Sequence, residues 1–245
     1  MVICKVEEKN ELNNEVFVES LEVYLNSKML KRGNSFIKRT FDVLLSIFGI
    51  IAFLPAALVI SAAILIEDGF PVIFKQVRTG RDWKDFWFLK FRSMQKESEK
   101  KGPVLVQVND GRVTKIGKII RSMALDELPQ LINILKGDLS FVGPRPERPE
   151  LINEIIKIHP SFTIRNIIRP GLTGMAQVYG NYDSNPYKKL KYDLFYIQKW
   201  SFWLDVKLLF KSLWITFQAA WNKRSKRVRF LRQKTRKIKN IINKN

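Results

Sequence analysis

The chain has few of the residues from which metal and redox sites are commonly built. Its 245 residues include one cysteine, Cys4, and one histidine, His159. A single cysteine excludes an intramolecular disulfide and a cysteine-based metal site, and a single histidine excludes a multi-histidine zinc cluster. Any metal that the chain binds is therefore predicted to be a hard cation held by carboxylates.

Acidic residues are also scarce in comparison with basic ones. Lys and Arg number 43 against 23 Asp and Glu, which gives a net charge of +20. Such a chain usually meets nucleic acid, an anionic membrane face or phosphorylated small molecules. Residues 222–245 hold eleven of the basic residues and no acid, so about half of the excess charge lies in this tail. Because no nucleic-acid-binding motif accompanies it, we predict attachment to anionic membrane lipids and no nucleic-acid partner, with a solubilising tail as the alternative.

The first thirty residues lack the charged start, short apolar core and cleavage site of a secretory signal peptide. Residues 1–35 mix glutamates with a weak helical stripe of apolar residues. We expect a surface segment that stays attached and carries no chemistry.

A charge-free apolar run extends from residue 43 to residue 66 and is long enough to cross a bilayer as a helix. Pro55 falls near its middle, and basic residues flank both ends. Since positive residues mark the cytoplasmic side, we interpret residues 36–67 as a re-entrant membrane helix hairpin that breaks at Pro55 and enters and leaves on that side. A kinked single-pass anchor and a buried soluble helix are the alternatives.

Two short strands, near residues 72–74 and 86–89, are predicted from apolar and aromatic runs on either side of a turn. Lys90 and Arg92 alternate with apolar residues at the end of the second run. Their side chains are expected to project from one strand face and to suit a phosphate, with a solvated strand edge as the alternative.

An adjacent carboxylate pair, Asp126 and Glu127, follows a basic stretch that includes Arg112 and Arg121. A helix is predicted to start close to the pair, because proline at position 129 is tolerated only in the first turn and apolar residues then recur at helical spacing. These apolar residues are Leu128, Leu131, Ile132 and Leu135. At a helix N-terminus a carboxylate is kept ionised and oriented, which suits both a nucleophile and a plain N-cap.

Two loops rich in proline and glycine come next. Prolines on both sides of Arg145 restrict its backbone, and a rigid arginine suits bidentate phosphate recognition. Arg169 precedes a Pro-Gly turn in which Gly171, Thr173 and Gly174 are expected to expose backbone donors to phosphate or ribose oxygens. A plain turn between helices is the alternative for the first loop.

Residues 200–221 are typical of an amphipathic helix at a bilayer interface, because four tryptophans accompany a helical stripe of apolar residues. The stripe consists of Val206, Leu209, Phe210, Leu213 and Phe217, and Asp205 lies off it with the polar residues. Together with the basic tail, this helix is expected to attach the protein to an anionic membrane face.

Several motifs in a fixed order carry a resemblance to a known family. They are KRTFDVLLS at 38–46, PVIFKQVRTG at 71–80, FLKFRSM at 88–94, the long run at 112–146, RPGLTGMAQVYG at 169–180 and YDLFYI at 192–197. Over residues 36–221 the chain resembles the bacterial sugar transferase family, the monotopic polyprenyl-phosphate phosphoglycosyl transferases.

The resemblance implies that Asp126 is the nucleophile, attacking the β-phosphorus of a nucleotide-diphosphate sugar, and that Glu127 helps to hold Mg²⁺. A covalent aspartyl intermediate would then pass the sugar phosphate to polyprenyl phosphate after the nucleoside monophosphate has left. The resemblance also carries over a set of basic residues as phosphate or substrate contacts, namely Lys90, Arg92, Arg112, Arg121 and Arg145.

The chain departs from the family pattern in places. Leu54 stands where a serine commonly precedes the re-entrant proline, Ala124 replaces a common serine before the carboxylate pair, and Met175 replaces a usual tryptophan. At 179–181 the sequence Tyr-Gly-Asn replaces a common Asn-Gly-Arg, which removes one candidate contact to the sugar or uridine.

Together these features predict an α+β, mostly helical protein with a small β element and amphipathic interfacial helices around a cytosolic active site. We expect a surface segment (1–35), the re-entrant helix (36–67), a catalytic domain (68–221) and the basic tail (222–245). The resemblance implies a nucleotide-sugar donor, a polyprenyl phosphate acceptor and a place on the cytoplasmic face of the bacterial cell membrane, with a homodimer as one oligomeric option. A single-pass membrane scaffold and a basic nucleic-acid-binding protein are the rival interpretations.

Overall fold

A computed structural model describes residues 35–96, 98, 110–180, 186–218 and 220–221. The predictions for the N-terminal surface segment and for the basic tail therefore fall almost wholly outside the described residues.

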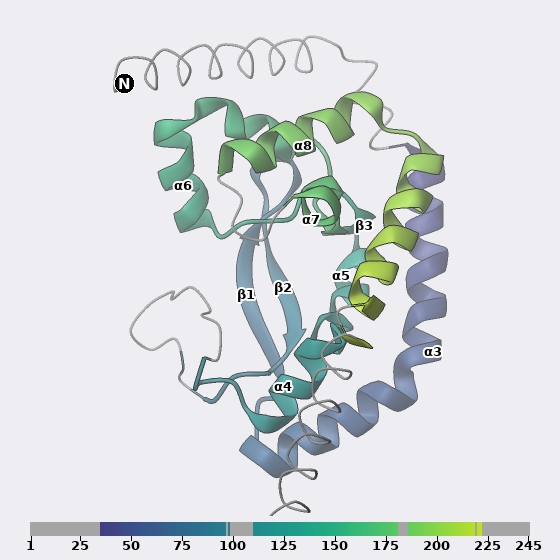
Figure 1. Cartoon of the computed structure of the whole chain (residues 1–245), viewed down its shortest axis with the longest axis vertical. Coiled ribbons are helices and arrows are strands. Elements are labelled where there is room, and N and C mark those ends of the chain that lie inside the picture. Colours follow the sequence, from purple (N-terminus) through teal and green to yellow (C-terminus); the bar gives the residue numbers. More distant parts are fainter. Residues whose placement is uncertain (1–34, 97, 99–109, 181–185, 219, 222–245) are drawn as a thin grey trace, which may run out of the picture.

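An antiparallel β-hairpin stands in the middle of the molecule (Figure 1). β1 (Ile73–Thr79) pairs with β2 (Asp85–Phe91), and the register sets Phe74 opposite Lys90. The short 3-10 turn η1 (Arg81–Trp83) connects the two strands. Both predicted strands are confirmed, and both are longer than the apolar runs that indicated them.

Helices surround this hairpin. At one end of it, in the lower part of Figure 1, α4 leads through the 3-10 turn η2 into α5; at the other end lie α6, η3, α7 and α8. Their bounds are α4 (Lys115–Ser122), η2 (Leu125–Glu127), α5 (Gln130–Lys136), α6 (Pro149–Ile158), η3 (Pro160–Ile167), α7 (Met175–Tyr179) and α8 (Pro186–Lys199). A last helix covers residues 202–218. The fold is thus mostly helical with a small sheet, as predicted.

A second, very short sheet joins β3 (Ser140–Val142) to β4 (Gly171–Thr173) in parallel. The two chains approach so closely that a Cβ on Gly171 would lie 2.1 Å from the backbone nitrogen of Gly143. Glycine at both positions is therefore required by backbone packing.

Two apolar clusters form the core. The larger one joins α5, α6, α8 and the short sheet through buried residues that include Ile134, Leu139, Leu190 and Leu194. The smaller one packs Ile60 and Ile64 against Phe91 of β2 and Ile120 of α4.

The charge-free run forms one long helix, α3 (Phe36–Asp68), with Pro55 inside it. Ser35 caps its start, since its side-chain oxygen accepts the N–H of Lys38 at 3.2 Å. The helix is not interrupted at Pro55 as predicted; it continues and bends, so that its two halves run in different directions (Figure 1). A proline inside a helix removes one backbone hydrogen bond and commonly bends the helix without ending it.

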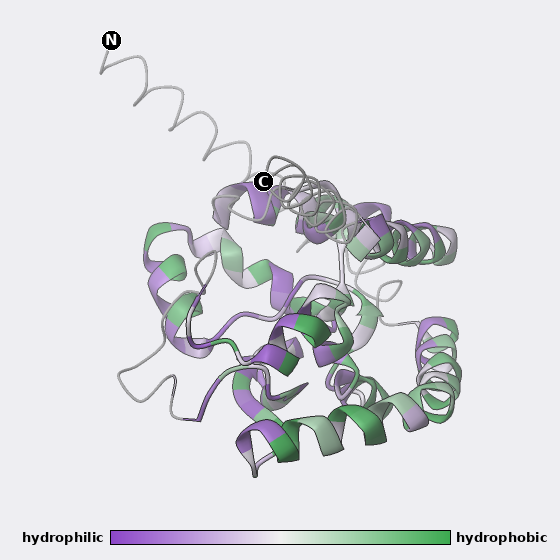
Figure 2. Ribbon diagram, turned by 60° about the horizontal axis from the view of Figure 1, so that its bottom comes forward, coloured by the Kyte–Doolittle hydropathy of each residue, from purple (hydrophilic) through white to green (hydrophobic). Residues whose placement is uncertain are grey.

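The burial of α3 is inverted relative to that of a water-soluble helix. In its first half the buried residues are small or polar, and they are Lys38, Asp42, Ser46 and Gly49. Its large apolar side chains point away from the protein, and Leu44, Phe48, Ile51, Leu58 and Val59 are all more than 60% exposed. Figure 2 shows the hydrophobic colouring along this helix. By length and composition, α3 is the one helix among the described residues that could cross a membrane.

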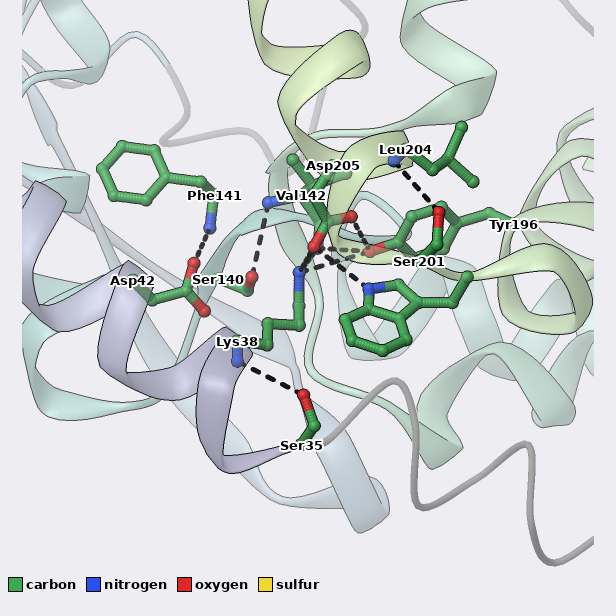
Figure 3. A network of polar contacts seen from close by, with 11 residues as sticks. Ser35, Lys38, Asp42, Ser140, Phe141, Val142, Tyr196, Ser201, Leu204 and Asp205 are labelled. Carbon is green, nitrogen blue, oxygen red and sulfur yellow. Dashed lines mark hydrogen bonds and ion pairs between the residues drawn. The ribbon is translucent and has the colours of Figure 1, made fainter.

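A closed polar network fixes the first turns of α3 to the rest of the protein (Figure 3). Lys38 Nζ lies 2.5 Å from Asp205 Oδ2 and donates to the carbonyl of Val142 at 3.0 Å. Tyr196 and Trp200 also donate to the Asp205 carboxylate, at 2.7 and 3.0 Å. Asp205 is therefore buried as the link between helix 202–218 and α3, and the prediction that it lies on the polar outer face is wrong.

Candidate active site

The carboxylate pair lies in η2, between α4 and α5. Ala124 precedes it with a left-handed backbone (φ 55°), a conformation that is uncommon for a residue with a Cβ and that turns the chain sharply out of α4. α5 then starts at Gln130, which confirms the predicted helix start close to the pair.

The predicted helix-capping role of Asp126 is wrong. The cap positions of η2 and α5 are Ala124 and Pro129, and neither terminus has a side-chain cap. The predicted apolar stripe is confirmed for Leu128 and Leu131, which pack in the core, and is wrong for Ile132 and Leu135, which are exposed. In place of the latter two, α5 buries Gln130, Asn133 and Ile134. The 3-10 turn shifts the helical phase relative to a continuous helix, so a different face meets the core.

Glu127 is held by two cations from distant parts of the chain. Its Oε1 accepts from Lys90 Nζ of β2 and from Arg145 Nη2 of the loop after β3, each at 2.8 Å. Burial alone would raise the pKa of this carboxyl, but the charges and hydrogen bonds of Arg145 and Lys90 outweigh it and lower the pKa to about 2. Among the described residues nothing bonds to the other oxygen, Oε2. Glu127 is thus firmly ionised with one oxygen still available.

Asp126 is in a different state although it is the adjacent residue. It is 8% exposed, and burial raises its pKa above the ordinary value, with the neighbouring Glu127 adding to the shift while Lys90 and Arg121 oppose it. No other described residue hydrogen-bonds its carboxylate. Two adjacent carboxyls whose pKa values are pushed apart are typical of sites in which the two groups have different chemical roles.

The helix that follows the carboxylate pair is attached directly to β2. Asn133 of α5 accepts the N–H of Leu89 through Oδ1 at 3.1 Å and donates Nδ2 to the carbonyl of Trp87 at 2.8 Å. This pair of hydrogen bonds to the strand backbone fixes the distance between η2 and Lys90. Sequence reasoning missed Asn133; the signal was a polar residue inside an otherwise apolar helical segment.

A buried aromatic ring gathers the cations of the site. Phe88 is 2% exposed, and Lys90 Nζ, Arg78 Cζ and Arg145 Cζ lie 5.3, 5.5 and 6.0 Å from its ring centre. Such a ring attracts cations through its negative face. Phe88 was also missed, although its spacing of two from Lys90 places both on one strand face.

Arg145 is held on several sides. Its Nη1 donates to the carbonyl of Leu172 at 3.3 Å. The carbonyl of the next residue, Pro146, accepts a hydrogen bond from Arg78 at 3.1 Å. The charge of Glu127 raises the pKa of Arg145 further above its ordinary value. The structure therefore brings Lys90, Arg145 and the carboxylate pair together, as the sequence suggested.

The remaining predicted contacts are distributed differently. Arg121 acts on Asp126 through its charge, and its Nη1 is buried without a hydrogen-bond partner among the described residues. The guanidinium of Arg112 donates two hydrogen bonds to Asp110, of 2.9 and 2.6 Å, and the backbone N–H of Arg112 donates a third at 3.0 Å. Arg169 donates to the carbonyl of Gly137 at 3.2 Å. Burial and the nearby charges of Arg81 and Arg39 lower its pKa. Only Arg121 of these three is placed beside the carboxylate pair.

Arg92 directly follows the last residue of β2, and its backbone N–H donates to the carbonyl of Val72 at 2.8 Å. Its guanidinium binds the end of α3, where it donates to the carbonyls of Asp68 and Gly69 at 2.8 and 2.5 Å. It also lies 3.0 Å from the Asp68 carboxylate. Lys90 and Arg92 thus have separate protein partners, and a phosphate face shared by the two stays a prediction.

The expected exposed donors of the second loop are also absent from the described structure. Gly171, Thr173 and Gly174 are buried, and the N–H of Gly171 donates to the carbonyl of Pro144 at 2.9 Å. The Thr173 carbonyl accepts the N–H of Gly143 at 2.9 Å. These residues bond the backbone just before Arg145 and do not form an open anion-binding site.

The carboxylate pair fits one mode of Mg²⁺ binding. In the part of the chain that the structure describes, no group of three or more His, Cys, Asp or Glu is arranged to hold a metal. Mg²⁺, however, is usually bound by one or two carboxylates together with water and substrate phosphates. Glu127 Oε2 and the Asp126 carboxylate supply such a set.

Taken as a whole, the site has more positive than negative charge. Two carboxylates face three cations, Lys90, Arg121 and Arg145, and two of those cations are already joined to Glu127. An arrangement of this kind can bind a polyanion and stabilise the charge that develops when a phosphoryl group is transferred.

Comparison with known proteins identifies similar chains. A family model described as bacterial sugar transferase matches residues 33–219. A UDP-N-acetylgalactosamine-undecaprenyl-phosphate N-acetylgalactosaminephosphotransferase of Aeromonas hydrophila is 42% identical over 182 residues, 73% of this chain and 43% of that protein. A UDP-glucose:undecaprenyl-phosphate glucose-1-phosphate transferase of Klebsiella pneumoniae is 39% identical over 75% of this chain and 41% of its own length.

A shorter relative is covered over most of its length. It is an uncharacterized sugar transferase, EpsL, of Bacillus subtilis, and it is 41% identical over 71% of this chain and 83% of its own length. The chain thus spans less than half of the first two relatives and most of the third.

Proposed function

Because the chain belongs to the bacterial sugar transferase family, we propose that it transfers a sugar 1-phosphate from a UDP-sugar to undecaprenyl phosphate and releases UMP. The observation that carries the proposal is the pair of adjacent carboxyls with opposite pKa shifts, set among three cations. Relatives named for this reaction support the class of donor and acceptor.

Asp126 is the proposed nucleophile. Its carboxylate oxygen attacks the β-phosphorus of the donor, the bond from that phosphorus to the bridging oxygen breaks, and UMP leaves with that oxygen. The sugar phosphate is then carried on Asp126 as an acyl phosphate. A phosphate oxygen of undecaprenyl phosphate attacks the same phosphorus and releases the Asp126 carboxylate. The Asp126 carboxylate accepts no hydrogen bond from another described residue, which suits this covalent role.

The cations have the complementary role. Arg145 and Lys90 hold Glu127 in place and offer their remaining donors to the diphosphate, while Arg121 adds charge beside Asp126. We propose that Glu127, with Asp126, binds Mg²⁺. When bound, Mg²⁺ would neutralise the phosphate oxygens on which negative charge develops.

The inverted helix α3 supports a membrane location for this site. A patch of large apolar side chains as extensive as that on α3 marks a membrane or protein interface. Helix 202–218 exposes a second set, which includes Trp203, Phe210, Leu213, Trp214 and Phe217. We propose that α3 enters the cytoplasmic leaflet as a bent, re-entrant element and that helix 202–218 lies at the headgroup level, where it meets the acceptor phosphate.

The reaction is tested with purified protein, undecaprenyl phosphate, Mg²⁺ and separate UDP-sugars, among them UDP-N-acetylgalactosamine, UDP-glucose and UDP-galactose. We expect acceptor-dependent UMP release and a lipid-linked sugar with at least one donor. Incubation with that donor alone should add one sugar phosphate to the protein at Asp126, detectable by mass spectrometry and absent from Asp126→Ala. Transfer by Asp126→Ala at the wild-type rate would exclude the nucleophile assignment.

The membrane topology is tested separately. Single cysteines introduced after replacement of Cys4, one at each end of the chain, should both be labelled from the cytoplasmic side by a membrane-impermeant reagent. Labelling of one end from the outside would show that α3 spans the bilayer and would leave the transfer chemistry unaffected.

A further inference from the structure

A second ionic cluster contacts the backbone of Arg145. It is formed by Arg165 of η3 and Asp193 of α8, whose side chains are 3% and 1% exposed. Arg165 Nη2 lies 2.8 Å from Asp193 Oδ2. The candidate active site uses neither side chain.

The cluster is joined to the site through one backbone carbonyl. The same Nη2 atom of Arg165 donates to the carbonyl oxygen of Arg145 at 2.9 Å. The side chain of Arg145 bonds Glu127 at 2.8 Å. Asp193, Arg165, Arg145 and Glu127 therefore form one continuous series of contacts.

The position of the Arg165 guanidinium is strongly restricted. Its Cζ lies 4.5 Å from the ring centre of Phe162, and its Nη1 lies 4.0 Å from Glu147 Oε1 in the same loop as Arg145. Stacking on a ring, a buried carboxylate partner and a backbone acceptor leave the planar group little freedom. Arg165 can thus fix the backbone at position 145.

We propose that Asp193 and Arg165 are positioning residues for the transfer reaction: they hold the Arg145 backbone so that its guanidinium stays bonded to Glu127. In its effect on turnover this inference rests on the function proposed above. The effect on the Arg145 loop itself does not depend on that function.

The location of the pair argues against a purely structural role. Replacing a buried ion pair by apolar residues is often neutral or stabilising, so burial of such a pair is weak evidence for a contribution to stability. This pair acts on the carbonyl of a residue that holds the proposed metal-binding glutamate. Residues that orient a metal-binding group without touching the metal themselves commonly affect activity by about 10–100-fold.

The charges that face Asp193 give the pair a pH-dependent element. They come from Arg165 on η3, Glu147 in the Arg145 loop and Lys189 on the same helix as Asp193. Burial raises the pKa of Asp193 to about 6, although Arg165 opposes the shift. Protonation at lower pH would remove the charge that holds Arg165.

The test compares single and double variants in UMP release with undecaprenyl phosphate and the preferred UDP-sugar. Arg165→Met is expected to lower kcat/KM by about 10–100-fold, and Arg165→Lys by less. In an Arg145→Met background, Arg165→Met should cause little further loss, because the group that it positions is already missing. Additive losses would overturn the proposal.

Asp205→Asn is the matched control, since it breaks a similarly buried carboxylate network whose hydrogen bonds reach the carbonyl of Val142 but not that of Arg145. Each rate is divided by the amount of enzyme that forms the covalent adduct, so that loss of folded protein does not appear as loss of kcat. Asp205→Asn should combine additively with Arg145→Met. If Asp205→Asn and Arg165→Met deviate from additivity with Arg145→Met to the same extent, the effect comes from general destabilisation. That result would contradict the positioning role.

Two further measurements separate this inference from the proposed function. The ratio of wild-type to Asp193→Asn activity should shrink as the pH falls from about 8 to about 5, because protonated Asp193 resembles asparagine. If wild-type protein releases no UMP with any donor, the proposed function fails, and thermal unfolding still tests the coupling. The Tm losses of Arg145→Met and Asp193→Asn should then be less than additive, and additive losses would overturn the positioning role.

Discussion

Two ionic clusters of this protein have similar components and opposite properties, one fully buried and one partly exposed. In the Lys38 cluster of Figure 3 the pair of Lys38 and Asp205 is saturated, although Oδ2 of the nearby Asp42 has no partner: the ammonium contacts Val142, Tyr196 and Asp205, and the Asp205 carboxylate accepts from three groups. The Glu127 cluster is not saturated, since Oε2 of Glu127, the Asp126 carboxylate and Nη1 of Arg121 have unused bonding capacity among the described residues.

The difference separates a cluster that holds helices together from one that can bind a ligand. A buried charge is tolerated when its hydrogen-bonding capacity is filled, and the pair of Lys38 and Asp205 meets this condition without any other molecule. The Glu127 cluster has an excess of cations and unfilled donors and acceptors, so a polyanion would complete it. We therefore assign a structural role to the first cluster and the proposed chemistry to the second.

The largest expected effect comes from Asp126→Asn. Transfer should fall by roughly a thousandfold or more, because the nucleophilic oxygen is lost. Stability should not fall: burial raises the pKa of Asp126, so its ionised form at neutral pH costs folding free energy that a neutral amide avoids. UMP release and Tm of the same preparation check both parts. A Tm loss of several degrees would show that Asp126 is structural.

Breaking the saturated cluster should have the opposite outcome. Lys38→Met leaves the Asp205 carboxylate buried without its cation, a change that typically costs about 3–5 kcal/mol. Since 1 kcal/mol corresponds to about 2–4 °C for a chain of this size, we expect Tm to fall by about 10 °C. Turnover per mole of covalent adduct should stay close to wild type. A selective loss of turnover at unchanged Tm would contradict the structural assignment.

Arg145→Met should lower kcat/KM by about a hundredfold, the usual effect of removing one group that stabilises charge in the transition state. It should also raise the pKa of Glu127 from about 2, because the charge of Arg145 is the largest of the influences that lower it. Arg145→Lys keeps the charge and loses the planar geometry, so its activity should be intermediate. Equal activity of the Met and Lys variants would exclude a role for the charge.

Sequence patterns predicted the local structure around these two clusters. They failed for contacts between segments that are distant in the sequence. Strand alternation indicated β2 but not the partners of its cations: Lys90 reaches Glu127, whereas Arg92 binds the end of α3. The partners of Glu127 lie 37 and 18 residues away, and the contact of Arg165 with the Arg145 carbonyl spans 20. No short-range periodicity encodes such contacts. For the same reason Asp205 was expected on a polar face, whereas its partner Lys38 is 167 residues away.

The smallest expected effect is a separation of activity from stability as the pH is lowered. Glu127 has a folded-state pKa of about 2, below its ordinary 4.5, so the stability that it contributes is complete above pH 4.5 and is lost between 4.5 and about 2. Asp126 has a pKa raised above 3.8, so it takes up a proton at higher pH than an ordinary aspartate, and the folded state gains stability when it does. The nucleophile is therefore neutralised before the Glu127 cluster is weakened.

Profiles of kcat/KM and Tm on one set of buffers should show transfer declining on the acid side while Tm is maintained. A parallel decline of both would mean that protonation of Asp126 does not limit the reaction.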